Sequence, residues 1–180
     1  MKITNSPTST YQPAPEGIHS ALCVDVIDLG INPTPYGDKA QLRIVFELES
    51  KMDDGRPFTQ SQKFTASLHP KATLAQFLAK WRGKPIGDNE TLDLDKLLGA
   101  QATLVISHEQ AKDGSGKTFA VIDAISKATK KLTASGEYDP AAARQRIADY
   151  KAKQPATGKP VNKPAYQHAE VEPPLEEPNF

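Results

Sequence analysis

The chain has 180 residues, 15 of them proline, and a mean hydropathy of −0.52, which fits one domain of ordinary size with polar extensions and excludes two full domains. Its 22 basic and 22 acidic side chains cancel, so the bulk charge gives no sign of a nucleic-acid-binding protein. No apolar run approaches the roughly 18 residues of a membrane span, and residues 1–17 lack a signal peptide's apolar stretch; we expect a cytoplasmic protein with no membrane partner.

The charges are distributed unevenly along the chain. Residues 16–127 carry 13 basic and 15 acidic side chains, residues 128–165 carry 8 and 3, and residues 166–180 carry 0 and 4. Residues 1–15 mix Ser, Thr and Pro without periodicity, which is typical of a disordered arm. We therefore predict a disordered arm (1–15), one folded domain (16–127), a basic connector (128–165) that can form a helix over 139–153, and an acidic, disordered tail (166–180).

Strand-like alternation begins after Gly17. Over residues 18–29 it predicts a first strand, and the Pro- and Gly-containing residues 31–38 predict the loop that follows. The residues expected to share the core face of this strand are Ser20, Leu22, Val24 and Val26.

Residues 39–49 show the clearest alternation in the chain and predict a half-buried second strand. Asp53, Asp54 and Gly55 supply turn chemistry, and residues 58–68 predict the returning strand of a hairpin. The apolar face of the second strand comprises Ala40, Leu42, Ile44, Phe46 and Leu48, and that of the third includes Phe58 and Phe64.

The period then changes to that of a helix. Residues 70–81 place Leu74, Phe77, Leu78 and Trp81 at helical spacing, and Gly83 ends the run. After a short helix or turn within 89–99, residues 102–106 and 118–125 predict two more strands, joined by a loop over 109–117. Five strands with one helix between the third and fourth is the order of an OB-type β-barrel, whose ligand face is formed by strands 2 and 3 and the loops at 31–38 and 109–117.

The chain has no constellation typical of an enzyme. Residues 114–118 read Gly-Ser-Gly-Lys-Thr, but position 111 is Ala where a P-loop needs its first Gly, and a strand follows where a helix is required. The four histidines have no paired spacing and Cys23 is the only cysteine, so we expect no metal site, no other cofactor and no disulfide. Cys23 lies among apolar residues of a strand and is expected to be a small core residue.

A nucleic-acid-binding barrel needs cations for phosphates and aromatic rings for unpaired bases. The predicted ligand face and its two loops supply a set of such side chains, each of which could also be ordinary surface. The candidates are Tyr36, Lys39, Arg43, Arg56, Lys63, Lys112, Lys117 and Phe119.

The C-terminal tail combines acidic residues and prolines with a terminal aromatic ring. An acidic tail can serve solubility alone, but Leu175 and Phe180 add apolar groups that a partner's pocket can bind. The tip resembles that of bacterial and bacteriophage single-stranded DNA-binding proteins, which end in an acidic stretch closing on Phe. By that resemblance the residues that dock replication or recombination proteins are Glu176, Glu177, Pro178 and Phe180.

The body also resembles a group of bacteriophage replication-region proteins. The similar segments are 11–17 (YQPAPEG), 64–69 (FTASLH), 77–84 (FLAKWRGK) and 94–99 (LDKLLG). The two resemblances together imply a phage protein of the host cytoplasm that coats single-stranded DNA without sequence preference in replication or recombination, with the homo-oligomeric state left open. The alternative is a protein-interaction or inhibitor module built on the same barrel, without DNA binding.

Overall fold

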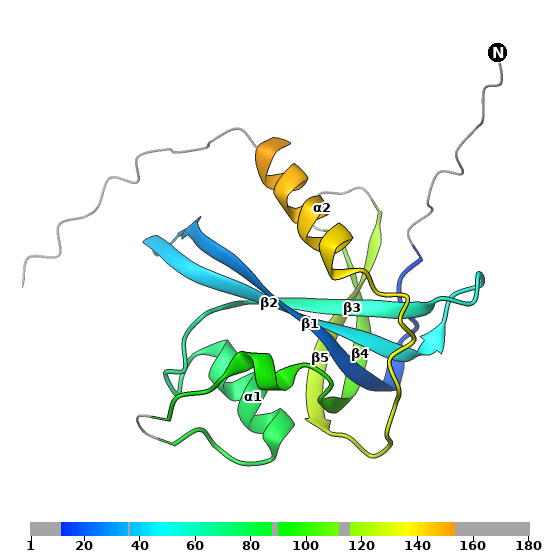
Figure 1. Cartoon of the computed structure of the whole chain (residues 1–180), viewed down its shortest axis with the longest axis horizontal. Coiled ribbons are helices and arrows are strands. Elements are labelled where there is room, and N and C mark those ends of the chain that lie inside the picture. Colours follow the sequence, from blue (N-terminus) through cyan, green and yellow to red (C-terminus); the bar gives the residue numbers. More distant parts are fainter. Residues whose placement is uncertain (1–11, 36, 88–89, 112–115, 154–180) are drawn as a thin grey trace, which may run out of the picture. The chain divides into compact units, whose positions relative to one another are not determined.

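Five antiparallel strands form one sheet in the order β3-β2-β1-β4-β5 (Figure 1). The computed structural model describes residues 12–35, 37–87, 90–111 and 116–153, and its chain divides into two units, Met1–Arg144 and Gln145–Phe180. The strands and the first helix lie in the first unit, and the second helix begins in it. The elements are β1 (Gly17–Thr34), β2 (Gly37–Lys51), β3 (Pro57–Thr65), α1 (Thr73–Arg82), the 3₁₀ turn η1 (Leu94–Leu97), β4 (Gln101–Gln110), β5 (Thr118–Lys127) and α2 (Pro140–Lys153).

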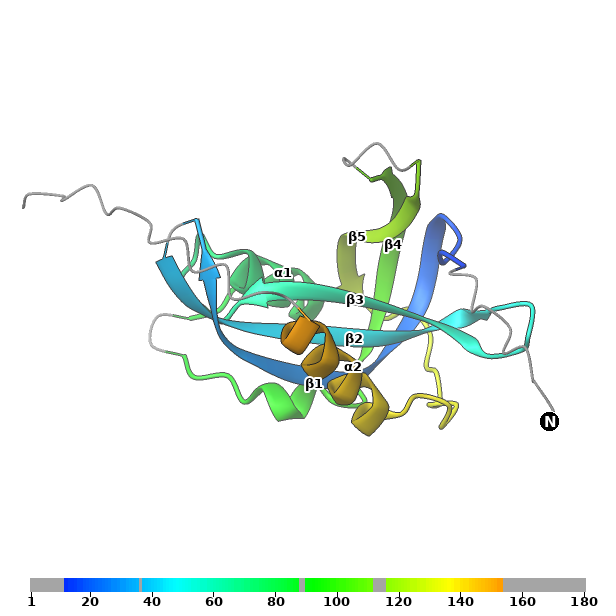
Figure 2. The ribbon, with the colours of Figure 1, turned by 90° about the horizontal axis from the view of Figure 1, so that it is seen from above.

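The long strand β1 connects the two halves of the sheet. Residues 17–22 of β1 pair with β4, and residues 21–34 pair with β2. Figure 2 shows that β4 and β5 consequently cross the direction of β2 and β3 steeply. The mainly β class and the five strands with a helix after the third are confirmed.

The predicted loop at 31–38 is wrong, because both strands continue through it. Asn32 pairs with Lys39 and Thr34 with Gly37, so the hairpin turns within two residues. The Thr34 hydroxyl donates to the Gly37 carbonyl (2.6 Å), and Gly37 has a φ of +91°, which other residues rarely adopt. The Pro and Gly residues at 31–38 predicted the position of the turn correctly, but the predicted loop was too long. The result is a long β1–β2 ribbon.

The core lies between the sheet and α1. The predicted apolar face of β2 is confirmed for Leu42, Ile44, Phe46 and Leu48, whereas Ala40 is exposed. On β1 the predicted face is wrong at its start: Ala21 and Cys23 enter the core, while Leu22 is buried on the opposite face beside Glu47. A β-bulge between Cys23 and Asp25 then changes the phase and returns Val26 to the core side.

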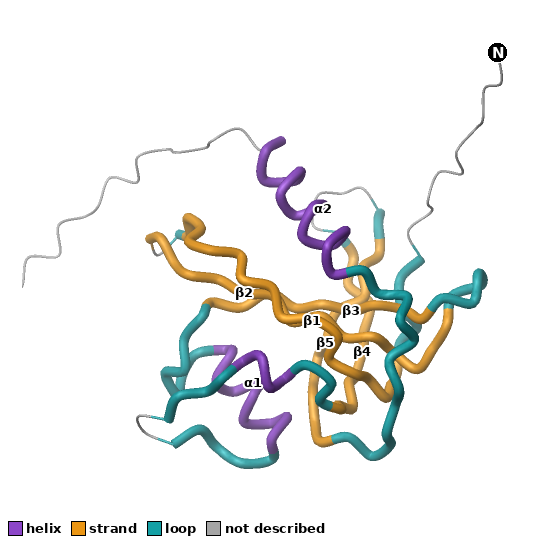
Figure 3. Tube along the Cα trace, in the orientation of Figure 1, coloured by secondary structure: helices purple, strands orange, loops and turns teal. Residues whose placement is uncertain are grey.

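Helix α1 covers the core with the four side chains predicted from its spacing: Leu74, Phe77, Leu78 and Trp81 are all buried. Gly83 ends the helix in the left-handed conformation, and its N–H donates to the Lys80 carbonyl (3.3 Å). Trp81 also donates its indole N–H to the Gln101 carbonyl of β4 (2.7 Å), which ties the helix to the sheet. Figure 3 shows α1 and its flanking loops on one side of the sheet.

Strands β3 and β5 are the two edges of the sheet. The Gln60 side-chain amide of β3 donates to the Ala120 carbonyl of β5 (2.5 Å), which joins the edges by a side chain where the strand ladder is not continued. In the described part of the chain, no helix is long and apolar enough to cross a membrane. In the second unit, Gln145 donates to Asp149 (2.8 Å) one turn later along α2.

A candidate nucleic-acid interface

The predicted DNA-binding residues fall into separate groups on the fold. Lys39 and Arg43 lie on β2 and Lys63 on β3, so these three share the hairpin of strands 2 and 3. Arg56 lies at its turn, Lys117 immediately precedes β5, and Phe119 is the second residue of β5. Tyr36, Lys112 and the tail residues Glu176, Glu177, Pro178 and Phe180 fall outside the described residues.

Arg43 and Lys63 are directly opposite each other in the β2–β3 ladder. The Ala66 N–H donates to the Ala40 carbonyl (2.8 Å), which makes 40 and 66 a hydrogen-bonded pair and, by alternation, makes 43 and 63 a non-hydrogen-bonded pair. Side chains of such pairs are the closest across a sheet, and two like charges there repel each other. Nearby on the same face are Lys39, Gln41 and Thr65.

No acidic side chain neutralises this pair within the described residues. The described ion pairs occupy Arg56, Arg82, Lys96, Lys130 and Arg144, together with His108, and none involves Lys39, Arg43 or Lys63. Two cations held side by side without a counter-charge attract an anion from solution. The part of this face that carries Lys39, Arg43 and Lys63 is therefore positively charged.

Arg56 does not join this group. Its guanidinium donates to the Asp54 carboxylate at 2.6 and 2.8 Å within the β2–β3 turn, which raises the pKa of Arg56 and lowers the pKa of Asp54. Lys63 lies seven positions after Arg56 along β3, or about 23 Å of extended chain. Its charge is thus paired locally and lies far from the Arg43–Lys63 pair.

The β5 residues lie on the other half of the sheet. Phe119 is 42% exposed and pairs with Glu109 of β4, and the Lys117 carbonyl accepts the Ala111 N–H (2.7 Å) to close the β4–β5 hairpin. The predicted loop at 109–117 is close to the observed interval between β4 and β5. Phe119 can stack with a base only if a bound strand extends from β3 to this hairpin.

Residues 128–144, which we call the strap, cover part of the outer face of the sheet, which is the face that points away from the core under α1. The strap is fixed to the sheet by polar contacts: Leu132 and Gln101 exchange two hydrogen bonds (2.8 and 2.9 Å), and Ser135 donates its N–H and hydroxyl to Glu47 (both 2.8 Å). Lys130 pairs with Glu49. The strap thus covers the Glu47 end of β2.

The strap ends in a buried charge cluster. Asp25 of β1 is 4% exposed and accepts the Tyr138 hydroxyl (3.0 Å) and both Arg144 nitrogens (2.8 and 2.9 Å). Arg144 belongs to the segment predicted as a basic connector, and its charge pairs with an acid of the folded domain. Sequence reasoning did not identify this cluster; its signal was an acid, Asp25, in the middle of an apolar strand.

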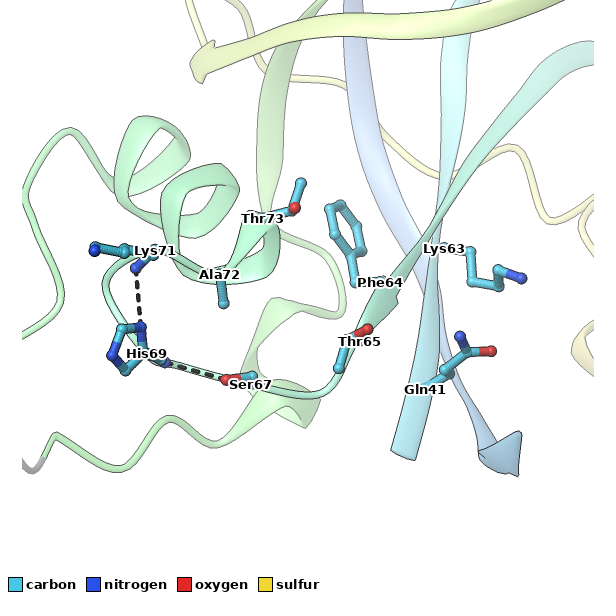
Figure 4. Close-up of a pocket in the computed structure, with 9 residues that line it drawn as sticks. All are labelled: Gln41, Lys63, Phe64, Thr65, Ser67, His69, Lys71, Ala72 and Thr73. Atoms are coloured by element: carbon cyan, nitrogen blue, oxygen red, sulfur yellow. Dashed lines mark hydrogen bonds between the residues drawn. The ribbon is translucent and has the colours of Figure 1, made fainter. Parts of the chain in front are cut away.

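A groove opens at the end of β3, where the chain leaves the sheet for α1 (Figure 4). It encloses about 610 Å³, and its lining contains Lys, His, Ser, Thr and Gln side chains but no Asp or Glu. The lining residues are Gln41, Lys63, Phe64, Thr65, Ser67, His69, Lys71, Ala72 and Thr73. Of these, only Lys63 was predicted as a site residue; Gln41 and Thr65 could have been added from the alternation that identified Arg43 and Lys63.

Cys23 is a buried core residue, as predicted, and burial raises the pKa of its thiol from 9.0 to about 12. Burial therefore favours the neutral thiol in the folded state. The contribution of this thiol to the free energy of unfolding is fully present below pH 9 and is lost as the pH rises towards 12. We expect Cys23 to be unreactive toward Ellman's reagent at pH 8 in the native protein and to react fully after denaturation. Rapid labelling of the native protein would contradict this burial.

The described residues contain no group of three or more His, Cys, Asp or Glu side chains that could hold a metal ion. His19 and His108 instead hydrogen-bond the carbonyls of Pro15 (2.8 Å) and Ala14 (2.7 Å), which pack the N-terminal segment on the sheet. No protein-family model matches this chain, and no curated protein matches it.

Proposed function

We propose that this chain binds single-stranded DNA without sequence preference on the outer face of β2 and β3. The proposal treats the sheet as an OB-type barrel: the order β3-β2-β1-β4-β5, the helix after β3 and the Gln60–Ala120 bond between the two edges support that interpretation. Such barrels bind oligonucleotides on strands 2 and 3. Lys39, Arg43 and Lys63 lie there, and none of them forms an ion pair with an acid among the described residues.

The observation that carries the proposal is the Arg43–Lys63 pair. Two like charges directly opposite in a ladder cost folding energy, and no described acid offsets that cost. A phosphate between them would offset it. Lys39, four residues along β2 from Arg43, adds a third cation about 13 Å away.

The test is a titration of fluorescent oligo-dT followed by anisotropy at several salt concentrations. Because three cations face the strand, we expect the logarithm of the binding constant to fall with log[salt] with a slope of about −2. The double variant Arg43→Ala/Lys63→Ala should bind about tenfold or more weakly at low salt, with a slope shallower by about 1.4.

The control for this titration is Lys80→Ala/Lys84→Ala, which removes the same charge at the exposed C-terminal end of α1. The control should retain wild-type affinity. Equal losses in the two double variants would show that net charge alone, and no site on β2 and β3, accounts for binding.

The remaining parts of the proposal concern the tail and the setting. Glu176, Glu177, Pro178 and Phe180 would recruit replication or recombination proteins, in the cytoplasm of a host cell infected by a phage. We assign the chain no bond-making or bond-breaking chemistry, no metal and no other cofactor. Removing residues 166–180 would then abolish partner recruitment and leave DNA binding to the barrel.

A second candidate function, a protein-interaction module, is favoured by one different observation. Ile18 of β1 and Val105 of β4 are cross-strand partners and are 76% and 37% exposed, so they form an apolar row on the outer face of the other half of the sheet. Exposed apolar groups in register are more typical of a protein interface than of a phosphate site. Absence of oligo-dT binding at low salt would favour this function over DNA binding.

A further inference from the structure

We infer that the groove at the end of β3 is a second contact site for the backbone of the same DNA strand, beyond the Arg43–Lys63 face. The inference rests on the proposed function and extends it to residues outside strands 2 and 3. It assigns Lys71, His69, Thr65 and Ser67 to phosphate and sugar oxygens, so the contact is independent of base sequence.

The groove continues the cationic face directly. Lys63 both pairs with Arg43 and lines the groove, and Gln41 and Thr65 are the next pair on the same face of the ladder. In Figure 4, Lys63 and Gln41 extend from one side of the hairpin, while His69 and Lys71 lie on the loop beyond its end. A strand that leaves Arg43 and Lys63 along this end of the hairpin therefore meets the groove next.

The loop that forms the far wall is held by its own hydrogen bonds. The His69 N–H donates to the Ser67 hydroxyl (3.3 Å), and the Lys71 N–H donates to His69 Nδ1 (3.2 Å). Because Nδ1 accepts, the neutral ring carries its proton on Nε2, which makes Nε2 a donor. His69 is exposed, so this donor is accessible to a phosphate oxygen.

The composition of the groove selects an anionic, polar ligand. Its lining includes two lysines, a histidine and three hydroxyl side chains, without an acid, and its volume of about 610 Å³ exceeds what one side chain fills. Phe64 lines it too but is 3% exposed, so it offers little ring surface for base stacking. A phosphodiester with its sugar therefore fits the lining better than a base does.

The experiment compares two lengths of oligo-dT, of about four and about twelve nucleotides, which lie near the two ends of the range of footprints of one OB barrel. In the wild-type protein the longer oligonucleotide reaches the groove and should bind more tightly. The double variant His69→Ala/Lys71→Ala should lose about tenfold in affinity for the longer oligonucleotide, with a salt slope shallower by about 0.7 and little change for the shorter one. Lys71→Arg should retain the length advantage. Lys80→Ala, which removes one exposed charge at the end of α1, is the charge-matched control.

Three results would overturn the inference. In the first, His69→Ala/Lys71→Ala is folded by circular dichroism and still binds the longer oligonucleotide more tightly by the wild-type factor. That result would leave the proposed DNA face intact and exclude the groove as a contact site for DNA. Binding of a labelled peptide of residues 170–180 that depends on His69 and Lys71, without any effect on DNA, would make the groove a peptide site. Failure of the wild-type protein to bind either oligonucleotide would instead refute the proposed function, and the inference with it.

Discussion

Replacing Arg144 with Met is expected to lower the free energy of unfolding by about 2–3 kcal/mol, because it leaves the buried Asp25 carboxylate with the Tyr138 hydroxyl as its remaining side-chain partner. The figure is below that for a fully buried pair, since the Arg144 side chain is 49% exposed and water can approach the vacated position. Asp25→Asn should cost less, about 1 kcal/mol, because Arg144 can be hydrated and the Tyr138 bond can persist.

Urea denaturation of the two single variants and of Arg144→Met/Asp25→Asn measures this asymmetry. The double variant should be more stable than Arg144→Met alone, since it removes the uncompensated charge. Arg146→Met is the control, because Arg146 is exposed and has no ion pair within the described residues. Losses that simply add in the double variant would show that the Asp25–Arg144 pair does not hold the strap.

The Phe46→Ala variant should lose about 3–5 kcal/mol of unfolding free energy. The Phe46 side chain is completely buried, and its ring packs against Trp81 and Phe77 with centroid separations of 5.3 and 6.3 Å. Truncation therefore opens a cavity between β2 and α1, two elements that cannot both shift to fill it. Thermal and urea unfolding measure the loss.

Phe119→Ala is the matched control for Phe46→Ala, because it removes the same side chain from a position that is 42% exposed. Its effect on stability should be within about 0.5 kcal/mol. If bound DNA extends to the β4–β5 hairpin, Phe119→Ala should also weaken oligo-dT binding. A loss of stability in Phe119→Ala as large as that in Phe46→Ala would contradict the observed core.

The core could be predicted from the sequence where one face of an element is buried and the other is exposed to solvent. This holds for β2 and α1, whose periods of 2 and 3.6 located Phe46, Leu78 and Trp81 correctly. It fails for the first half of β1, because the strap covers the outer face and buries Leu22 there as well. Alternation assigns no unique face when both are buried.

The candidate site could be predicted only in part, for a related reason. Arg43 and Lys63 follow from alternation within two strands, but their exact opposition depends on the β2–β3 register, which the turn at Asp53–Arg56 sets. The groove depends on how the chain runs from Thr65 to α1, and no periodicity governs a loop. The strap was missed because polar side chains hold it, and such contacts leave no hydrophobic pattern.

The strap joins residues that are very distant in the chain: 113 residues separate Tyr138 from Asp25, 119 separate Arg144 from it, and 88 separate Ser135 from Glu47. Closing loops of that length costs entropy before any contact repays it, so the strap should dock after the sheet has formed. Contacts absent from the folding transition state change the rate of unfolding far more than the rate of folding. The Asp25–Arg144 bond should therefore act as a kinetic latch, which sets how long the native protein persists once it has folded.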